Sequence, residues 1–295
     1  MFWVVYFLNH ADRQIVFSVF PLLQTELDLT NTQLGLLGSS FQWVYACLVP
    51  FAGFLGDFVS RKRIIVSALI LWSLTTVSSG LVTGFALLLT LRALTGAGEA
   101  FYYPSATSII ADYHGEKTRA LAMSIHQTSL YFGVVVSGTL AGYLGQQFGW
   151  RSAFLVFGIA GLAAAAMLLR FLHEPRRGEA EASGSQAEMP RDAKERGNAA
   201  PPSVMARLIA LCRTPSVLAL AGSFCGMSFA SVAVVTWMPA YIYGLGGFSL
   251  AEAGFHATFY HQLGAFVGVL AGGALADRFA ARTVLSRPLV QAGGL

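Results

Sequence analysis

Two pairs of ionisable residues lie inside long apolar segments of the sequence. Asp12 and Arg13 fall about midway along an apolar run at the start of the chain, and Arg92 and Glu99 lie within a second run, residues 86–111. A charge at the centre of a bilayer costs at least about 2.5–3.5 kcal/mol on insertion scales, so such residues usually face a cavity and have a function. Desolvation and a nearby arginine move the pKa of a carboxyl group in opposite directions, and a group balanced between them can bind and release protons. We therefore interpret Asp12 and Glu99 as candidate proton carriers.

Arg92 is the candidate partner of these carboxyl groups. It precedes Glu99 by seven residues, or two helical turns, so both side chains project from one helix face about 10 Å apart. Arg92 could serve as a counter-charge or as the anchor for an anionic substrate. The alternative is a structural ion pair that fixes the helix of Asp12 to the helix of Glu99. Arg13 is turned about 100° away from Asp12 and is expected to pack against a neighbouring helix.

Three uncharged polar residues are further candidates for binding a substrate in the same cavity. Gln127 and Tyr131 lie four residues apart in one apolar segment, and Tyr241 lies near the end of another. Each could either line the cavity or pack between helices.

The composition predicts the elements that position these residues. Hydrophobic residues make up 55% of the 295 and charged residues only 12%, against about 25% charged in typical soluble domains. The segments 64–91, 120–150 and 214–251 contain no Asp, Glu, Lys or Arg. A helix that crosses the hydrocarbon core needs about 20 mostly apolar residues. The sequence therefore predicts an all-α protein that crosses a lipid bilayer several times.

Several other classes of protein are disfavoured. The three cysteines lie far apart without a CxxC pair, so a disulfide framework or a metal site is not expected. The net charge of +4 comes from short loops, which does not indicate a nucleic-acid partner. The motifs HExxH and GxSxG do not occur in the sequence, so neither an enzyme nor a cofactor is predicted.

Hydropathy predicts eight membrane spans, with boundaries accurate to a few residues. The predicted spans are 2–23, 32–56, 64–82, 86–111, 120–145, 152–172, 215–243 and 253–276. The remaining apolar stretch, 283–295, is too short to cross.

The distribution of basic residues predicts the orientation. With both ends of the eight-span set on one side, that side holds 16 of the 19 Lys and Arg residues, and the opposite side holds only Arg151. The positive-inside rule places the basic side in the cytoplasm. The connection at 24–31 is then outside the cell, and the loop at 173–214 is cytoplasmic.

The longest loop, 173–214, marks the expected domain boundary. Its composition through about residue 202 cannot bury a core and predicts disorder. The pattern at 203–212 predicts a short helix at the membrane surface. We expect a bundle of six helices at 1–172, a cytoplasmic loop at 173–214, and a partial second bundle at 215–295.

The sequence repeats itself across this loop. Gly53, Leu55 and Asp57 recur 220 residues later as Gly273, Leu275 and Asp277. Basic residues follow both copies: Arg61 and Lys62 follow the first, and Arg278 follows the second. Both copies lie at the cytoplasmic end of the second predicted helix of their half.

This repeat resembles the signature of the major facilitator superfamily between its second and third helices, with the weaker copy between the eighth and ninth. Segments that begin at Arg92, Gly149 and Trp237 are similar to further motifs of the superfamily. Asn9, Asp12 and Arg13 resemble the Asn-x-x-Asp-Arg of two of its groups. These are the Spinster-like transporters of lysolipids and the sialin and hexuronate type of organic anion:proton symporter.

The resemblance implies a secondary active transporter with alternating access, in which the first and fourth helices line the central cavity. The expected partners are a small organic solute (an organic anion or a lysolipid) and protons. It also implies a latch between the two halves, formed by Gly53, Asp57, Arg61, Lys62, Asp277 and Arg278. Family members have twelve helices, so the chain looks truncated at its C-terminus.

The full-length protein is expected to be a monomer in the inner membrane of the cell. The alternative is a fragment that does not transport, a channel or a scaffold protein.

Overall fold

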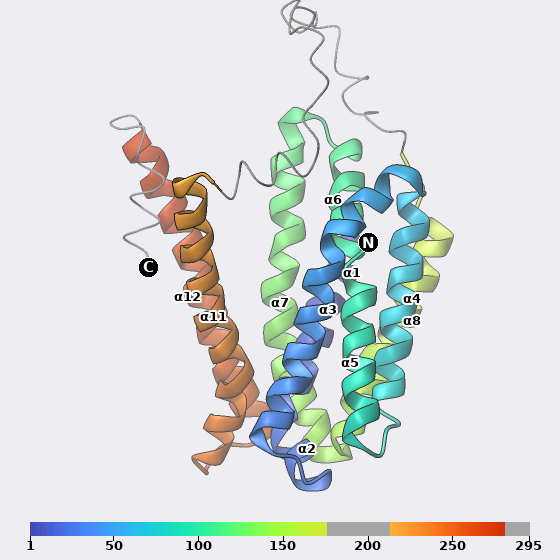
Figure 1. Cartoon of the computed structure of the whole chain (residues 1–295), viewed down its shortest axis with the longest axis vertical. Coiled ribbons are helices and arrows are strands. Elements are labelled where there is room, and N and C mark those ends of the chain that lie inside the picture. Colours follow the sequence, from blue (N-terminus) through green and yellow to red (C-terminus); the bar gives the residue numbers. More distant parts are fainter. Residues whose placement is uncertain (176–212, 281–295) are drawn as a thin grey trace, which may run out of the picture. The chain divides into compact units, whose positions relative to one another are not determined.

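The structure is a computed structural model that describes residues 1–175 and 213–280. These residues form helices joined by short turns, with no strand among them (Figure 1). The helices are α1 (Phe2–Ser18), α2 (Phe20–Glu26), α3 (Asn31–Phe58), α4 (Arg61–Ser79), α5 (Phe85–Glu99), α6 (Tyr102–Tyr113), α7 (Glu116–Phe148), α8 (Trp150–Phe171), α11 (Pro215–Gly244) and α12 (Leu250–Ala280). The predicted all-α membrane fold is confirmed, with six spans before the central loop and two after it.

The first and fourth predicted spans are each broken into two helices, which the hydropathy pattern did not predict. Pro104 explains the break between α5 and α6, because proline has no N–H for the carbonyl of Ala100 and its ring collides with that carbonyl. At the break, the amide of Phe101 donates to the carbonyl of Gly98, three residues earlier, at 3.4 Å. Pro21 follows the corresponding break between α1 and α2. The break in the fourth span comes directly after Glu99.

Side-chain caps fix the starts of three helices. Thr30 and Gln33 form a capping box before α3, and the hydroxyl of Ser60 accepts from the amide of Arg63 before α4. Ser249 and Glu252 bond each other's amides before α12. Such caps satisfy amides that a helix leaves unpaired at its first turn.

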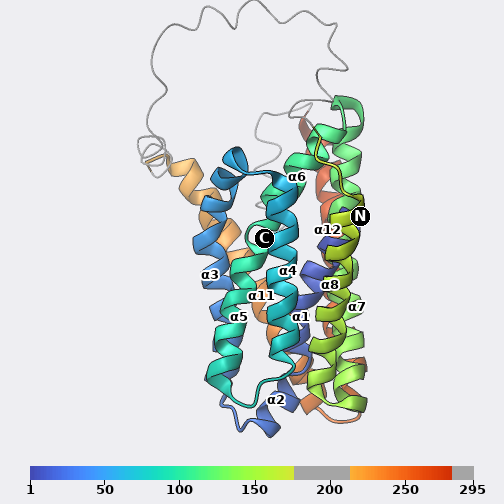
Figure 2. The ribbon, with the colours of Figure 1, turned by 90° about the vertical axis from the view of Figure 1, so that its right-hand side faces the viewer.

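Small residues allow the helices to pack closely around α1. The hydroxyl of Ser137 on α7 donates to the carbonyl of Ala11 at 2.8 Å. A Cβ at Gly133 of α7 would lie 2.6 Å from the carbonyl oxygen of Phe7, and one at Gly96 of α5 would lie 2.5 Å from that of Phe41 on α3. Helices α4 and α8 lie side by side in the same way (Figure 2). Within this packing, Asp12 and Arg13 of α1 contact residues of α3, α4 and α5.

Two compact units are present. The first contains Met1–Ser183 together with Val235–Gly264, and the second contains Gly184–Val234 and Ala265–Leu295. The first unit holds α1 to α8 and the adjoining ends of α11 and α12. The predicted surface helix at 203–212, the loop at 176–202 and the stretch at 283–295 lie outside the described residues.

Three of the described helices are long and apolar enough to cross a membrane by length and composition. They contain the spans Asn31–Gly53, Trp150–Phe171 and Pro215–Gly244. The first and fourth predicted spans are interrupted, and each carries two of the buried charges.

Candidate functional site

The four predicted ionisable residues come together in the interior of the first unit. Asp12, Arg92 and Glu99 are only 1–2% exposed. Thr76 of α4 joins them, with Phe41 and Tyr45 of α3. We call these seven residues the buried charge cluster: Asp12, Arg13, Phe41, Tyr45, Thr76, Arg92 and Glu99.

Arg13 is the hydrogen-bonded partner of Glu99. Its Nε lies 2.6 Å from Glu99 Oε2, and the carboxylate is fully buried. The guanidinium group also lies over the rings of Tyr45 and Phe41, at 4.6 and 5.1 Å from their centres. Arg13 does pack against a neighbouring helix, as predicted, but the sequence did not show that it also pairs with Glu99 on a third helix.

Arg92 is held more loosely. Its Nη1 donates to the main-chain carbonyl of Asp12 at 3.4 Å, and its guanidinium group lies 5.1 Å from the centre of the Phe41 ring. Its Nε has no hydrogen-bond partner among the described residues. A buried guanidinium group without a bonded carboxylate is suited to receive an anion, because arginine presents several donors in a fixed geometry.

Each carboxyl group keeps one oxygen available. Asp12 Oδ2 accepts from the hydroxyl of Thr76 at 3.3 Å, whereas Asp12 Oδ1 and Glu99 Oε1 have no hydrogen-bond partner in the part of the chain that is described. With both carboxylates ionised, they balance the two guanidinium groups. One added proton leaves a net positive charge beside Arg92. The cluster can therefore couple the binding of a proton to the binding of an anion.

The other predicted substrate-binding residues lie on α7 and α11. Gln127 is exposed and Tyr131 is half-buried one turn further along α7. Tyr241 on α11 is 63% exposed. The structure thus leaves surface on all three side chains, and only Asp12, Arg92 and Glu99 of the predicted set lie in the buried charge cluster.

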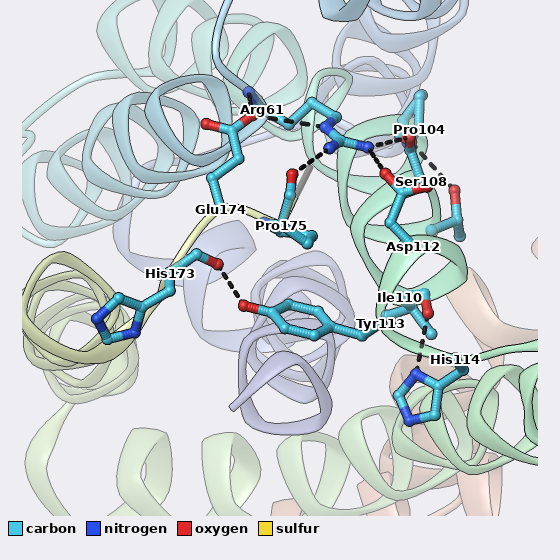
Figure 3. Close-up of polar contacts among 11 residues, drawn as sticks. Arg61, Pro104, Ser108, Ile110, Asp112, Tyr113, His114, His173, Glu174 and Pro175 are labelled. Carbon is cyan, nitrogen blue, oxygen red and sulfur yellow. Dashed lines mark hydrogen bonds and ion pairs between the residues drawn. The ribbon is translucent and has the colours of Figure 1, made fainter. Parts of the chain in front are cut away.

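A second polar network surrounds Arg61 at the start of α4 (Figure 3). Arg61 Nη1 donates to Ser108 at 2.8 Å and forms an ion pair with Asp112, both on α6. Its Nη2 donates to the carbonyl of Pro175 at 3.2 Å, and its main-chain amide donates to Glu174 Oε1 at 2.8 Å. We call Arg61, Ser108, Asp112, Glu174 and Pro175 the Arg61 network. It ties α4 to α6 and to the segment that follows α8.

Glu174 is fixed by hydrogen bonds outside the spans. Partial burial raises the pKa of its carboxyl group, but hydrogen bonds from Ser60 and Arg61 outweigh burial, so the pKa lies below its ordinary value. Tyr113 adds a bond to the carbonyl of His173 at 2.6 Å (Figure 3). Asp112 and Glu174 were not among the residues predicted from the sequence. They lie at the ends of the fourth and sixth predicted spans, on the same predicted side of the membrane as Arg61. This shared side was the feature of the sequence that could have indicated them.

A cavity of about 290 Å³ adjoins the Arg61 network. Its lining residues are Ala52, Gly53, Gly56, Arg61, Pro104, Ser105, Ser108 and Asp112. Of the predicted latch, Gly53 and Arg61 line this cavity, and Lys62 donates to the carbonyl of Leu169 at 3.2 Å. The side chains of Asp57, Asp277 and Arg278 lie outside the described set.

A third polar group closes the opposite end of the first unit. Glu26 accepts from Trp150 at 2.8 Å and forms an ion pair with Arg151, whose Nη2 donates to the carbonyl of Val82 at 3.1 Å. The hydrogen bond from Arg151 lowers the pKa of Glu26 most, and that from Trp150 lowers it further. This group joins three turns and defines what we call the Glu26 end.

The fold and the buried charge cluster together define an integral membrane protein whose helices surround charged residues at mid-span. The chain belongs to the Major Facilitator Superfamily, whose family model matches residues 2–292.

Its relatives include a sugar-acid transporter and a Spinster homologue, in keeping with the two groups that the motif in α1 resembles. The chain is 28% identical over 292 residues to the "Probable galactarate/D-glucarate transporter GudP" of Bacillus subtilis, covering 94% of this chain and 63% of the relative. It is 31% identical over 246 residues to protein spinster homolog 1 of Homo sapiens, covering 80% of this chain and 43% of the relative.

A solved structure has the same fold. It is a bacterial homologue of the human lysosomal transporter Spinster in an inward-facing, unoccupied conformation, with a TM-score of 0.80 and 26% identity. The match covers 96% of this chain and 62% of that chain. The chain thus spans less than two thirds of the length of these relatives.

Proposed function

We propose that the protein is a secondary active transporter that moves a small organic solute across the membrane by alternating access, coupled to protons. The buried charge cluster carries this proposal, because it places two carboxyl groups and a loosely held arginine inside a membrane bundle. Charges in that position are costly and usually belong to a substrate or proton pathway.

The proposed substrate is an organic anion, with a lysolipid as the second candidate. Arg92 supports the anion, since its Nε is the one buried guanidinium nitrogen of the described cluster without a hydrogen-bond partner. The names of the relatives support both classes, because one is named for galactarate and D-glucarate and the other is a spinster homologue. Gln127, Tyr131 and Tyr241 are proposed to contact the uncharged part of the substrate.

Asp12 and Glu99 are the proposed proton carriers. When Glu99 is protonated, its hydrogen bond with Arg13 weakens and the cluster becomes net positive. A singly charged anion that then binds Arg92 returns the net charge of the cluster to zero. When the substrate leaves, the carboxyl group can release its proton and pair with Arg13 again. Proton and anion would therefore travel together.

The proposed location is the inner membrane, with the loop at 173–214 in the cytoplasm and a monomer as the working unit. The proposed latch of Gly53, Asp57, Arg61, Lys62, Asp277 and Arg278 then lies on the cytoplasmic side. The proposed domains remain 1–172, 173–214 and 215–295. A cysteine placed at Asp28 should react with an impermeant reagent added outside intact cells.

The test is uptake by the complete polypeptide that carries this chain, reconstituted in proteoliposomes. D-glucarate and a lysophospholipid are supplied separately, with and without an inward proton gradient. We expect Glu99→Gln to abolish accumulation driven by the gradient while exchange of the substrate continues. The matched control is Asp28→Asn, which changes an exposed carboxylate in a turn.

Two outcomes count against the proposal. Normal proton-driven accumulation by Glu99→Gln would assign Glu99 a structural role. Uptake without stimulation by substrate on the far side would indicate a channel, since counterflow is a property of carriers.

A further inference from the structure

One aromatic ring lies against both arginines of the buried charge cluster. The guanidinium carbon of Arg13, on α1, and that of Arg92, on α5, are each 5.1 Å from the centre of the Phe41 ring. Phe41 belongs to α3 and is 2% exposed. Two like charges from different helices are therefore held at no more than twice that distance from each other.

The two arginines depend on this ring to different degrees. Arg13 also has Glu99 at 2.6 Å and the ring of Tyr45 at 4.6 Å. Arg92 has one long bond, to the carbonyl of Asp12 at 3.4 Å, and an Nε without a partner among the described residues. Beside that long hydrogen bond, the face of Phe41 is a second favourable contact of the Arg92 charge.

The backbone of Phe41 lies close to α5. A Cβ at Gly96 of α5 would lie 2.5 Å from the carbonyl oxygen of Phe41, which shows how closely α3 approaches α5 here. The ring also stacks on Tyr45 of its own helix, with centres 5.9 Å apart and planes at 16°. Its place beside the two arginines depends on the close approach of α3 to α5.

We propose that Phe41 is a positioning residue, whose ring keeps Arg92 away from the carboxyl groups and available to an anionic substrate. This inference rests on the proposed transport function. The attraction of a cation to a ring face is strongest where both are desolvated, as they are here. The ring therefore competes with Asp12 and Glu99 for Arg92. The titratable groups around the two arginines are Tyr6, His10, Asp12, Tyr45 and Glu99.

Removing the ring face should release Arg92 to a carboxylate. In Phe41→Leu, the side chain remains apolar but the favourable contact with the cation is lost. Arg92 then pairs with Asp12 or Glu99, and that carboxylate stays ionised to lower pH. We expect the pH midpoint of uptake to fall by about one unit and the KM for an anion to rise about tenfold.

The transport test uses D-glucarate as the anionic probe with the complete polypeptide. Phe41→Tyr keeps a ring face and should retain the parent's pH midpoint. Phe157→Leu on α8 is the matched control, because Phe157 is also buried (4% exposed) and lies on a helix that contributes no residue to the cluster. Equal pH midpoints and KM values in the parent and Phe41→Leu would overturn the inference. Failure of the parent to take up D-glucarate would count against the proposed substrate instead.

A second measurement tests the inference without any substrate. Thermal unfolding in detergent is compared for the parent, Phe41→Leu, Arg92→Met and the double variant. If the ring supports the charge, Phe41→Leu lowers the unfolding temperature less in the Arg92→Met background than in the parent. Equal losses in both backgrounds, like those of Phe157→Leu, would show that Phe41 is only a packing residue and overturn the inference.

Discussion

Close packing of α7 against α12 at the Glu26 end provides the sharpest test of the proposed alternating access. A Cβ at Gly142 of α7 would lie 2.5 Å from the carbonyl oxygen of Leu250 and 3.0 Å from the Cα of Ala251. Ordinary contacts of a Cβ begin at 3.4 Å. Gly142→Ala therefore forces α12 away from α7 by about 1 Å. The bond from the amide of Leu250 to Gln146, 2.9 Å in the parent, must lengthen or break.

The cost of this substitution falls on the conformation in which the two helices touch. Overpacking of this size costs about 1–3 kcal/mol, and each 1.4 kcal/mol is a factor of ten in a population ratio. The ratio of open to closed conformations at the Glu26 end should rise about 5-fold to 150-fold. Gly264→Ala on α12 is the control, because a Cβ there meets nothing within 4 Å.

Spin labels at Gln147 and Phe248 report the separation of the two helices at this end. The labels are attached to cysteines in a background whose three natural cysteines are serine. We expect a longer distance to gain population in Gly142→Ala but not in Gly264→Ala. An unchanged distribution in folded Gly142→Ala would refute the reasoning, because the contact would then have relaxed without opening.

Three further predictions concern the polar networks and the helix break. Because the pKa of Glu174 is lowered in the folded protein, its hydrogen bonds stabilise the fold fully above the pKa of about 4.3 that the carboxyl group has in the unfolded chain. This stabilisation is lost as the pH falls through the pKa of the folded state. The difference in unfolding temperature between the parent and Glu174→Gln should thus be constant from pH 6 to 8 and shrink towards pH 3. Glu99→Gln should destabilise the protein by about 3 kcal/mol in chemical unfolding, which is the lower end for a broken buried ion pair because the Arg13 side chain is 23% exposed. The double variant Arg13→Met with Glu99→Leu should restore most of the lost stability. Equal stability of Glu99→Gln and the parent would show that the pair contributes nothing. Pro104→Ala supplies an amide that can donate to the carbonyl of Ala100, so this new amide should exchange slowly with solvent. Fast exchange of the new amide would show that the break has another cause.

The sequence predicted the number and order of the spans because apolar length is a local property. All eight predicted spans contain helix in the structure, with ends a few residues away in most cases. The breaks after Glu99 and Ser18 were missed because hydropathy averages over a window and does not see that Pro104 and Pro21 remove single hydrogen bonds.

The site was predicted less completely than the fold. The positions of Asp12, Arg92 and Glu99 inside apolar runs were sufficient to select them, since a charged residue within an apolar segment can be recognised from the sequence alone. The partner of Glu99 was not visible, because Arg13 and Glu99 are 86 residues apart and their meeting depends on the crossing of α1 and α5. Phe41 was missed for a similar reason, since one more aromatic residue in an apolar helix carries no signal until its neighbours are known.

The buried pair between Arg13 and Glu99 also constrains biogenesis. The first span must enter the membrane carrying Asp12 and Arg13, each costly at mid-helix. Its partner Glu99 is synthesised 86 residues later, which at about 5–20 residues per second is a delay of about 4–17 s. During that interval the first helix has no neutralising neighbour in the lipid. A hydrated or protein-lined site that held this span until the fourth span emerged would avoid that cost.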